Sequence, residues 1–192
     1  MNDLLFNNLV YNNAYGILGL LSNSTQKEIS KRAKDIEKRL KIDDLLEYDY
    51  DFHLYNKLRT SSNIKEAQHK LSNPKTQVLQ YFFGTSVNSE KEKQFIDKIG
   101  KDLSYENIMN YSEAFSKKTF STNKNIAILL TLLQLTRKTD VALANVLKEK
   151  TIELWYEILY NKKSMRDFEK IYRLDDEIVD EVFDFLAKVV DR

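Results

Sequence analysis

The side chains best suited to chemistry in this chain are lysines that recur along one predicted helix. Between residues 27 and 41 they stand at alternating steps of four and three, a spacing that puts them on one side of a helix. They are Lys27, Lys31, Lys34, Lys38 and Lys41. A row of ammonium groups can dock on an acidic protein surface, and Arg32 and Arg39 add to its charge.

The same row is also typical of an ordinary solvated helix face. Lys31 with Asp35, and Glu37 with Lys41, have the spacing of four that predicts ion pairs along a helix. The row suits nucleic-acid binding poorly, because no aromatic side chains lie beside it on which bases could stack. Docking of an acidic partner and plain solvation therefore both remain open.

A segment rich in acids and tyrosines follows the lysines directly. It holds the acids Asp43, Asp44, Glu47, Asp49 and Asp51 and the aromatic residues Tyr48, Tyr50, Phe52 and Tyr55. Charged loops that contain tyrosine suit protein interfaces. We take four of its residues as candidate partner contacts beside Arg32 and the lysines: Asp43, Tyr48, Asp49 and Asp51. The segment can equally fold back on the lysine row and cover it.

Residue types that carry catalysis are sparse. The two histidines are far apart, and His53 with Asp49 and Asp51 is a weak metal set without a third strong ligand. Cysteine is absent, which excludes thiolate chemistry, disulfides and zinc–cysteine sites. The four glycines form no phosphate loop, and no serine lies in a nucleophile elbow. We expect a protein that is not an enzyme and that binds no metal and no cofactor.

The lysines need a helix to align them, and the sequence predicts one over about residues 25–41. Ser24 or Thr25 can cap its start, and Glu28 forms a capping box with Thr25. Apolar residues at helical spacing fall opposite the lysines and predict a buried side. They are Ile29, Ala33, Ile36 and Leu40.

Other helices should pack against that buried side. Residues 4–20 hold a short helix that ends near Gly19, and caps between Thr60 and Asn63 open another from about Ile64 to Ser72. Asn73-Pro74 ends it, and a last short helix stops at Gly84. We expect the two longer helices to run antiparallel, with their apolar sides together and the ammonium groups in water.

Composition favours helix over the whole chain. Glycine occurs four times and proline once in 192 residues, so few residues interrupt helices. We therefore predict an all-α protein. A polar link near residues 86–89 predicts two domains, a helical domain over 1–85 and a C-terminal helical bundle over 86–192.

The predicted bundle contains four to six helices. An apolar helix opens at Asn123 or Asn125 and runs to Lys138, and a long one runs from Asp140 to Tyr160. Aromatic residues in and after the long helix are expected to lie in the core, or to line a groove for a partner. They are Trp155, Tyr156, Tyr160, Phe168, Tyr172, Phe183 and Phe185.

Charge and hydropathy place the protein in the cytoplasm. The longest apolar run, Ile126 to Leu135, is shorter than the roughly 20 residues that a membrane span needs. The first residues, Met1 to Phe6, lack the pattern of a secretion signal. A net charge of +1 favours neither nucleic acid nor an anionic membrane as partner. The bias toward Asn, Lys and Ile suits an AT-rich bacterial genome.

Over about residues 12–85 the chain resembles a J-domain, the module that couples DnaJ-type co-chaperones to their ATPase. The family has an aromatic-Ile-Leu-Gly turn, a basic helix, an Ile and an Ala before a Leu-Ser-Asp-Pro turn, and a final Phe/Tyr-Gly. The residues that match in order are Tyr15, Ile17, Leu18, Gly19, Ile64, Ala67, Leu71, Ser72, Pro74, Phe83 and Gly84.

The resemblance fails at the residues that give the family its activity. Lys41 and Ile42 replace the His and Pro of the His-Pro-Asp tripeptide, and Asp43 alone remains. The connection after Asp43 is longer than usual, and Gln80 occupies a place often held by tyrosine. The resemblance thus implies a J-like fold that does not stimulate an ATPase.

The expected function is a non-catalytic protein-interaction or assembly module that docks a partner through the basic helix and the acidic segment. The alternative is a co-chaperone that still contacts a DnaK-type ATPase through the basic helix. An enzyme on the C-terminal bundle, and a phage-encoded or defence-system protein that binds a larger assembly, are further readings. The sequence determines neither the partner nor the oligomeric state.

Overall fold

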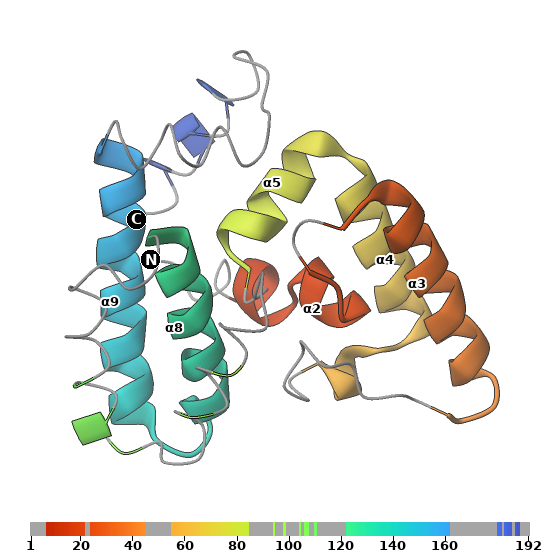
Figure 1. Cartoon of the computed structure of the whole chain (residues 1–192), viewed down its shortest axis with the longest axis horizontal. Helices are drawn as coiled ribbons and strands as arrows, with labels where there is room; N and C mark the ends of the chain where they lie inside the picture. The colour runs from red at the N-terminus through yellow and green to blue at the C-terminus, as the bar shows by residue number, and fades with distance from the viewer. Residues whose placement is uncertain are drawn as a thin grey trace. The chain divides into compact units, whose positions relative to one another are not determined.

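The structure is a computed structural model of the whole chain, drawn in Figure 1. It describes residues 7–21, 24–44, 55–84 and 122–161, together with positions 94, 98, 104, 106–107, 110, 180–181, 183–185 and 187–188. These residues form helices and turns and no strand, so the predicted all-α class is confirmed for them. The chain divides into two compact units, residues 2–88 and residues 89–192 with Met1. We describe each by itself.

The N-terminal unit is built around one central helix. Its elements are the π-helix η1 (Asn7–Tyr11), α2 (Ala14–Leu18), α3 (Gln26–Leu40), the 3₁₀-helix η2 (Asn56–Leu58), α4 (Ser61–Ser72) and α5 (Pro74–Phe82). Helix α4 contacts α2, α3 and α5 (Figure 1). Gln26 Nε2, at the start of α3, donates to Leu71 O near the end of α4 at 2.7 Å. The two helices therefore run antiparallel.

Side-chain caps fix where these helices begin. Thr25 accepts from Glu28 N–H and completes a capping box, Thr60 accepts from Asn63 N–H, and Asn73 accepts at the start of α5. Because Thr60 takes the cap position, α4 begins at Ser61, three residues before the predicted start at Ile64.

The predicted short helix that ends near Gly19 is α2, and the short helix η1 precedes it. The chain leaves η1 after Tyr11 and enters α2 only at Ala14. Asn13 has an extended backbone, and its side-chain oxygen accepts from Tyr15 N–H at 3.1 Å. An asparagine in this cap geometry starts a helix and cannot lie inside one, so the helical stretch breaks here.

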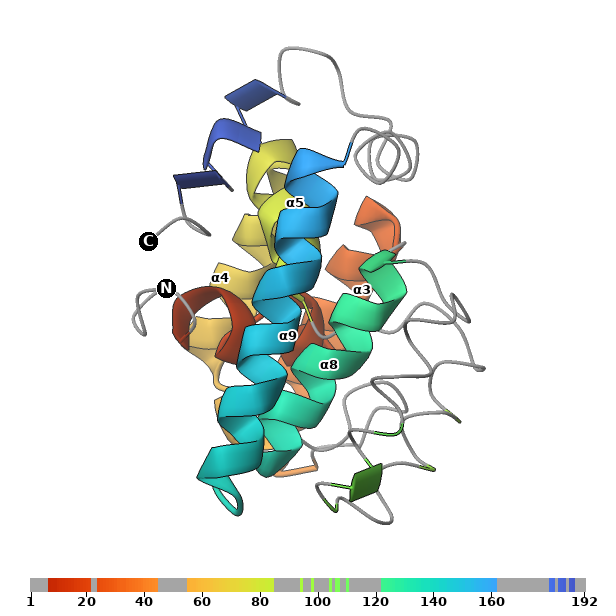
Figure 2. The ribbon, with the colours of Figure 1, turned by 90° about the vertical axis from the view of Figure 1, so that its left-hand side faces the viewer.

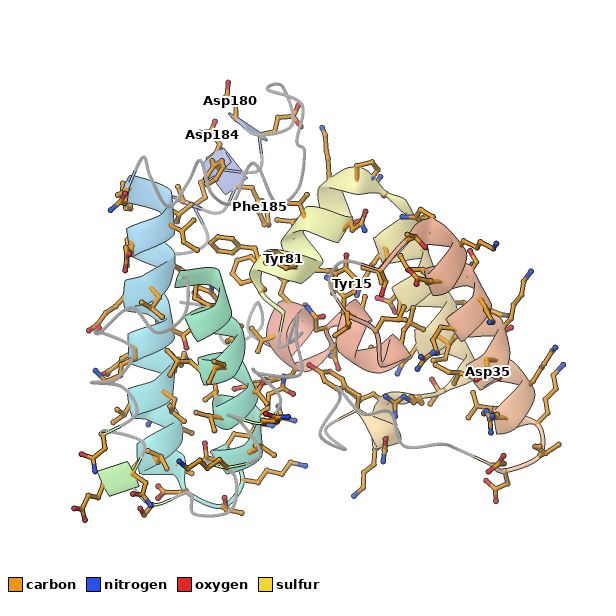
Figure 3. All side chains as sticks on the ribbon, in the orientation of Figure 1. Tyr15, Asp35, Tyr81, Asp180, Asp184 and Phe185 are labelled. Atoms are coloured by element: carbon orange, nitrogen blue, oxygen red, sulfur yellow. The ribbon has the colours of Figure 1, made fainter. Side chains whose placement is uncertain are left out.

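Apolar side chains from α2, α3 and α4 meet in one core. It holds Ala14, Tyr15, Ile17, Leu18, Leu20, Ile29, Ala33, Ile36, Tyr55, Ile64, Ala67 and Leu71, with Leu40, Leu58 and Tyr81 packed at its edge. Figure 3 shows Tyr15 in α2 and Tyr81 in α5. The predicted buried side of α3 is thus the side that faces this core.

The C-terminal unit contains two long helices that lie side by side, α8 (Thr122–Thr136) and α9 (Val141–Tyr160). Both views of the ribbon show them paired (Figures 1 and 2). Asp140 caps α9 by accepting from Leu143 N–H at 2.9 Å, as predicted. Every residue from 128 to 134 is buried, so α8 is covered on all sides over two turns.

The aromatic residues of this unit do not all lie in its core. Trp155 and Phe183 are buried. Tyr156 and Tyr160 are exposed and stack on each other with ring centroids 5.7 Å apart, and Phe185 is 40% exposed. Since α9 turns one side to α8, residues at spacing four on its other side meet solvent. The core prediction is wrong for these three residues.

Some expectations lie outside the described residues. They concern Phe168, Tyr172 and the other helices of the predicted bundle. Among the helices that the structure describes, none is long and apolar enough to cross a bilayer.

Candidate interaction surface

The lysine face of α3 consists of Lys27, Lys31, Lys34, Lys38 and Lys41. All five side chains are exposed, while Ile29, Ala33 and Ile36 on the opposite side are fully buried. Figure 3 shows nitrogen-tipped side chains that project from α3 on the side away from α4. The buried side and the capping box anchor the helix, so the lysines lie in a row along an anchored helix.

Two of the acids near this row, Asp35 and Asp44, pair with an arginine instead of a lysine. Asp35 binds Arg39 at 3.2 Å, and Arg39 also binds Asp44 at 2.9 Å. The predicted pairs Lys31–Asp35 and Glu37–Lys41 do not form in the structure. One guanidinium can bind two carboxylates at once and so competes well for Asp35. Over residues 24–44 the five lysines make no ion pair, and their charge faces water.

A shallow groove of about 770 Å³ runs beside the lysine face. One side is the turn after α2, with Leu20, Leu21 and Ser24. The other side is α3, which contributes Glu28, Lys31, Arg32, Lys34, Asp35 and Lys38. The surface thus combines ammonium groups with a strip of leucine.

The residues at the place of the J-domain tripeptide form the closing turn of α3. Lys41 caps the helix, and Ile42 is 72% exposed. Asp43 has a positive φ of 55°, and Asp44 N–H donates to Arg39 O at 3.0 Å. A left-handed residue followed by this hydrogen bond is the usual helix closure that glycine makes elsewhere. Asp43 therefore ends the helix and is itself exposed.

Buried polar side chains hold the N-terminal end of α2. Gln80 of α5 accepts from Ala14 N–H through Oε1 at 2.7 Å, and its backbone carbonyl accepts from Asn13 Nδ2. Both Asn13 and Gln80 are buried. The glutamine at the place where the J-domain family often has tyrosine thus satisfies a backbone donor of α2.

The C-terminal end of α2 is held by arginine. Arg59 is 2% exposed and donates to Ile17 O at 2.9 Å and to Gly16 O at 3.3 Å. A positive charge suits the C-terminal end of a helix. Arg32 of α3 donates to Gly19 O at 3.2 Å and is half-buried. Arg32 thus contributes to the fold as well as to the basic surface.

The ring of Tyr55 covers α2 at Gly16. A Cβ on Gly16 would lie 2.1 Å from Tyr55 Cζ, so only glycine fits. We call Asn13, Gly16, Tyr55, Arg59 and Gln80 the α2 frame. An isolated five-residue helix is unstable. The frame residues supply hydrogen bonds and side-chain packing that stabilise α2.

Tyr15 packs in the same region as a neutral phenol. Burial raises its pKa to about 12, although the hydrogen bond from Gln77 Nε2 at 3.0 Å acts in the opposite direction. Near the lysine face, hydrogen bonds from Thr25 lower the pKa of Glu28.

The predicted site residues fall into two sets. The lysines, Arg32 and Asp43 lie on α3 and its closing turn, as given above. Tyr48, Asp49, Asp51 and His53 lie outside the described residues, so the acidic segment and the weak metal set are not described. Within the described ranges, no cluster of acids and histidines could hold a metal ion.

Sequence reasoning missed the α2 frame. Gln80 interrupts the apolar run from Val78 to Phe83, and Arg59 stands directly before a helix cap. A polar residue inside an apolar run was the available signal for a buried hydrogen bond.

Comparison of the chain with protein-family models, curated proteins and solved structures finds no match.

Proposed function

We propose that this protein is a non-catalytic interaction module that docks an acidic protein surface on its lysine face. The observation that carries the proposal is the unneutralised row of five exposed lysines on a helix anchored from its other side. Like charges three or four residues apart on a helix repel by about 0.2–0.5 kcal/mol per pair. A partner that supplies carboxylates relieves this repulsion, whereas water relieves it only in part.

The groove beside the lysines adds specificity to this docking. Leu20 and Leu21 offer an apolar contact next to Lys31 and Lys34. An acidic partner helix or loop that also carries an apolar side chain fits both. Charge would mainly set the association rate and the choice of partner, and binding should weaken as salt increases.

We further propose that the N-terminal unit is a degenerate J-domain. The antiparallel α3 and α4, with the basic side of α3 outward and Lys41-Ile42-Asp43 at its end, support this. Because two of the three tripeptide members are absent, the unit would bind without stimulating an ATPase. It would act as an adaptor or assembly factor in the cytoplasm.

Affinity purification from native cells tests the docking. The wild type is compared with Lys31→Glu/Lys34→Glu/Lys38→Glu and with a control, Lys57→Glu/Lys65→Glu/Lys188→Glu, whose lysines are also exposed. Both variants change the net charge equally. Partners should be lost with the first variant and kept with the control. Partners that remain with the first variant would refute docking through this face.

ATP hydrolysis tests the co-chaperone alternative, which the same basic helix favours. The rate of steady-state ATP hydrolysis by a bacterial DnaK should not change when the wild-type chain is added. Clear stimulation would refute the adaptor proposal and support a working co-chaperone. The variant Lys41→His/Ile42→Pro restores the tripeptide with Asp43. If the unit is J-like, this variant should gain stimulation that the wild type lacks.

A further inference from the structure

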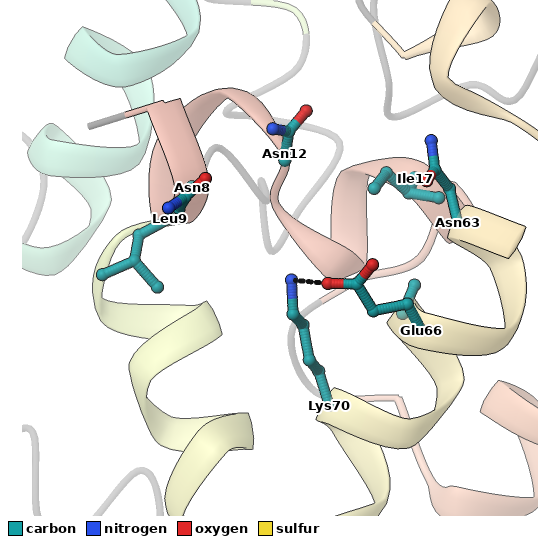
Figure 4. Close-up of a pocket in the computed structure, with 8 residues that line it drawn as sticks. Asn8, Leu9, Asn12, Ile17, Asn63, Glu66 and Lys70 are labelled. Carbon is teal, nitrogen blue, oxygen red and sulfur yellow. Dashed lines mark ion pairs between the residues drawn. The ribbon is translucent and has the colours of Figure 1, made fainter. Parts of the chain in front are cut away.

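A second hollow in the N-terminal unit shares no residue with the lysine face or its groove. It has a volume of about 530 Å³ and lies among η1, α2 and α4 (Figure 4). Its lining residues, which we call the amide pocket, are Asn8, Leu9, Asn12, Ile17, Asn63, Glu66, Ala67 and Lys70. Sites for small ligands and short peptides have this size.

Three asparagine amides line the pocket. Among the residues that the structure describes, Asn8 and Asn12 have no side-chain hydrogen bond, and both are at least partly exposed. Asn63 is oriented by its Nδ2 donation to Leu58 O at 2.8 Å, which leaves its oxygen available to a ligand. Each side-chain amide presents a donor and an acceptor in one plane, as a peptide group does.

The backbone beside the pocket is unusual. Asn8 lies in η1, a π-helical turn, and Asn12 directly follows that turn. Asn13 Nδ2 donates to Leu9 O at 3.1 Å and ties the turn to the start of α2. Turns of this type are rare and occur frequently at functional sites.

The charge of the pocket is compensated within the pocket itself. Lys70 Nζ binds Glu66 Oε1 at 2.7 Å, shown dashed in Figure 4. Half-buried Leu9 supplies the accessible apolar surface of the pocket, because Ile17 and Ala67 in its lining are buried. Because the ion pair cancels the local charge, the pocket has no net field that would favour a phosphate or another anion.

We propose that the amide pocket binds a short extended peptide segment that carries an aliphatic side chain. The asparagine amides pair with N–H and C=O groups of the peptide backbone, and the aliphatic side chain packs on Leu9. An uncharged ligand with alternating donors and acceptors can pair with the amides of Asn8 and Asn12 and with the side-chain oxygen of Asn63, whose Nδ2 is already bonded to Leu58 O. This site is independent of docking on the lysine face.

NMR titration of the ¹⁵N-labelled full chain tests the proposal. The probe is the capped peptide acetyl-Ala-Leu-Ala-Ala-amide, and its comparison is the same peptide N-methylated at Leu and the following Ala. Side-chain NH₂ signals of Asn8, Asn12 and Asn63 should shift and saturate with the first peptide. The methylated peptide lacks the backbone donors and should bind at least about fivefold more weakly.

Variants locate the binding. Asn8→Ala/Asn12→Ala should weaken binding of the capped peptide at least about fivefold, because two of the three pocket amides are removed. Asn145→Ala, an exposed asparagine of α9, should leave the affinity unchanged. Absence of saturable shifts, or equal binding of the methylated peptide, would overturn the proposal even if the double variant did not fold. Equal binding by a folded double variant would also overturn it.

Discussion

The α2 frame and the lysine face belong to the same unit, yet they use polar side chains in opposite ways. In the frame, Gln80 and Arg59 are almost fully buried and bind backbone groups of α2. On the face, Lys31 and Lys34 are exposed and make no hydrogen bond or ion pair within the part of the chain that the structure describes. A buried polar group is costly unless each of its bonds is made, whereas an exposed ammonium group is replaceable at little cost to folding.

Polar side chains therefore serve two different purposes in this unit. The frame residues bind backbone groups of α2 and pack against it, so we expect α2 to depend on them. The lysines make no such contact among the described residues, so we expect folding not to depend on them. Substitutions should therefore lower the free energy of unfolding strongly in the α2 frame and hardly at all on the lysine face.

Gly16→Ala should be the most damaging of these changes. The new methyl group would overlap the buried ring of Tyr55, at 2.1 Å from Cζ and 2.2 Å from Cε2. Overpacking of this kind costs about 3 kcal/mol of unfolding free energy. Urea denaturation followed by circular dichroism measures it.

A double-mutant cycle shows whether the ring is the cause. If it is, Gly16→Ala should cost less in a Tyr55→Leu background than in the wild type. Gly19→Ala is the comparison for a backbone effect: the φ of Gly19 is 57°, and alanine there should cost about 1 kcal/mol. A Gly16→Ala protein as stable as the wild type would contradict the tight contact.

Gln80→Leu should have the next-largest effect on the free energy of unfolding. The change keeps side-chain volume and removes the acceptor of the 2.7 Å bond from Ala14 N–H. A buried donor left without a partner costs about 2 kcal/mol. The matched change Gln77→Leu removes a half-buried bond to the Tyr15 hydroxyl and should cost about half as much or less. Equal effects of the two would show that burial of Gln80 does not set its importance.

Local features of the fold could be predicted from the sequence, because their partners are close along the chain. Thr25, Thr60 and Asp140 cap helices within three residues of themselves. The exposed lysines and the buried Ile29 and Ile36 follow from helical spacing alone. The all-α class followed from the scarcity of glycine and proline.

Non-local features could not be predicted in this way. Gln80 reaches a residue 66 positions away, and Arg59 one 42 positions away. Polar residues of these types are mostly exposed, so sequence alone assigns both to the surface. The choice of Arg39 over Lys31 by Asp35 also depends on Asp44, which only the closing turn of α3 brings near.

Thr25→Ala should have an intermediate effect at the start of α3. The threonine hydroxyl accepts from Glu28 N–H at 3.3 Å and donates to Glu28 Oε2 at 2.8 Å. Loss of such a cap costs about 1 kcal/mol. Ser24→Ala removes the other predicted cap, whose side chain makes no bond in the structure, and should be nearly neutral. Equal losses would mean that the helix can use either cap.

The cost of Thr25→Ala in unfolding free energy should depend on pH. Hydrogen bonds from Thr25 lower the pKa of Glu28 below its ordinary 4.5, so ionised Glu28 favours the folded state. That contribution is present above the unfolded-state pKa and is lost as the pH falls through the lower folded-state value. The cost of Thr25→Ala should therefore be smaller at about pH 3 than at about pH 7. A cost that does not change with pH would exclude Glu28 from the cap.

Lys31→Gln/Lys34→Gln/Lys38→Gln should have the smallest effect on folding. Relief of like-charge repulsion along α3 offsets the lost attraction to nearby acids, so unfolding free energy should change by less than about 0.5 kcal/mol. Arg32→Gln is the control from the same helix. It removes the bond to Gly19 O and should cost about 1 kcal/mol. If the triple variant were instead the less stable of the two, the lysines would serve the fold, and their exposure would no longer point to a partner.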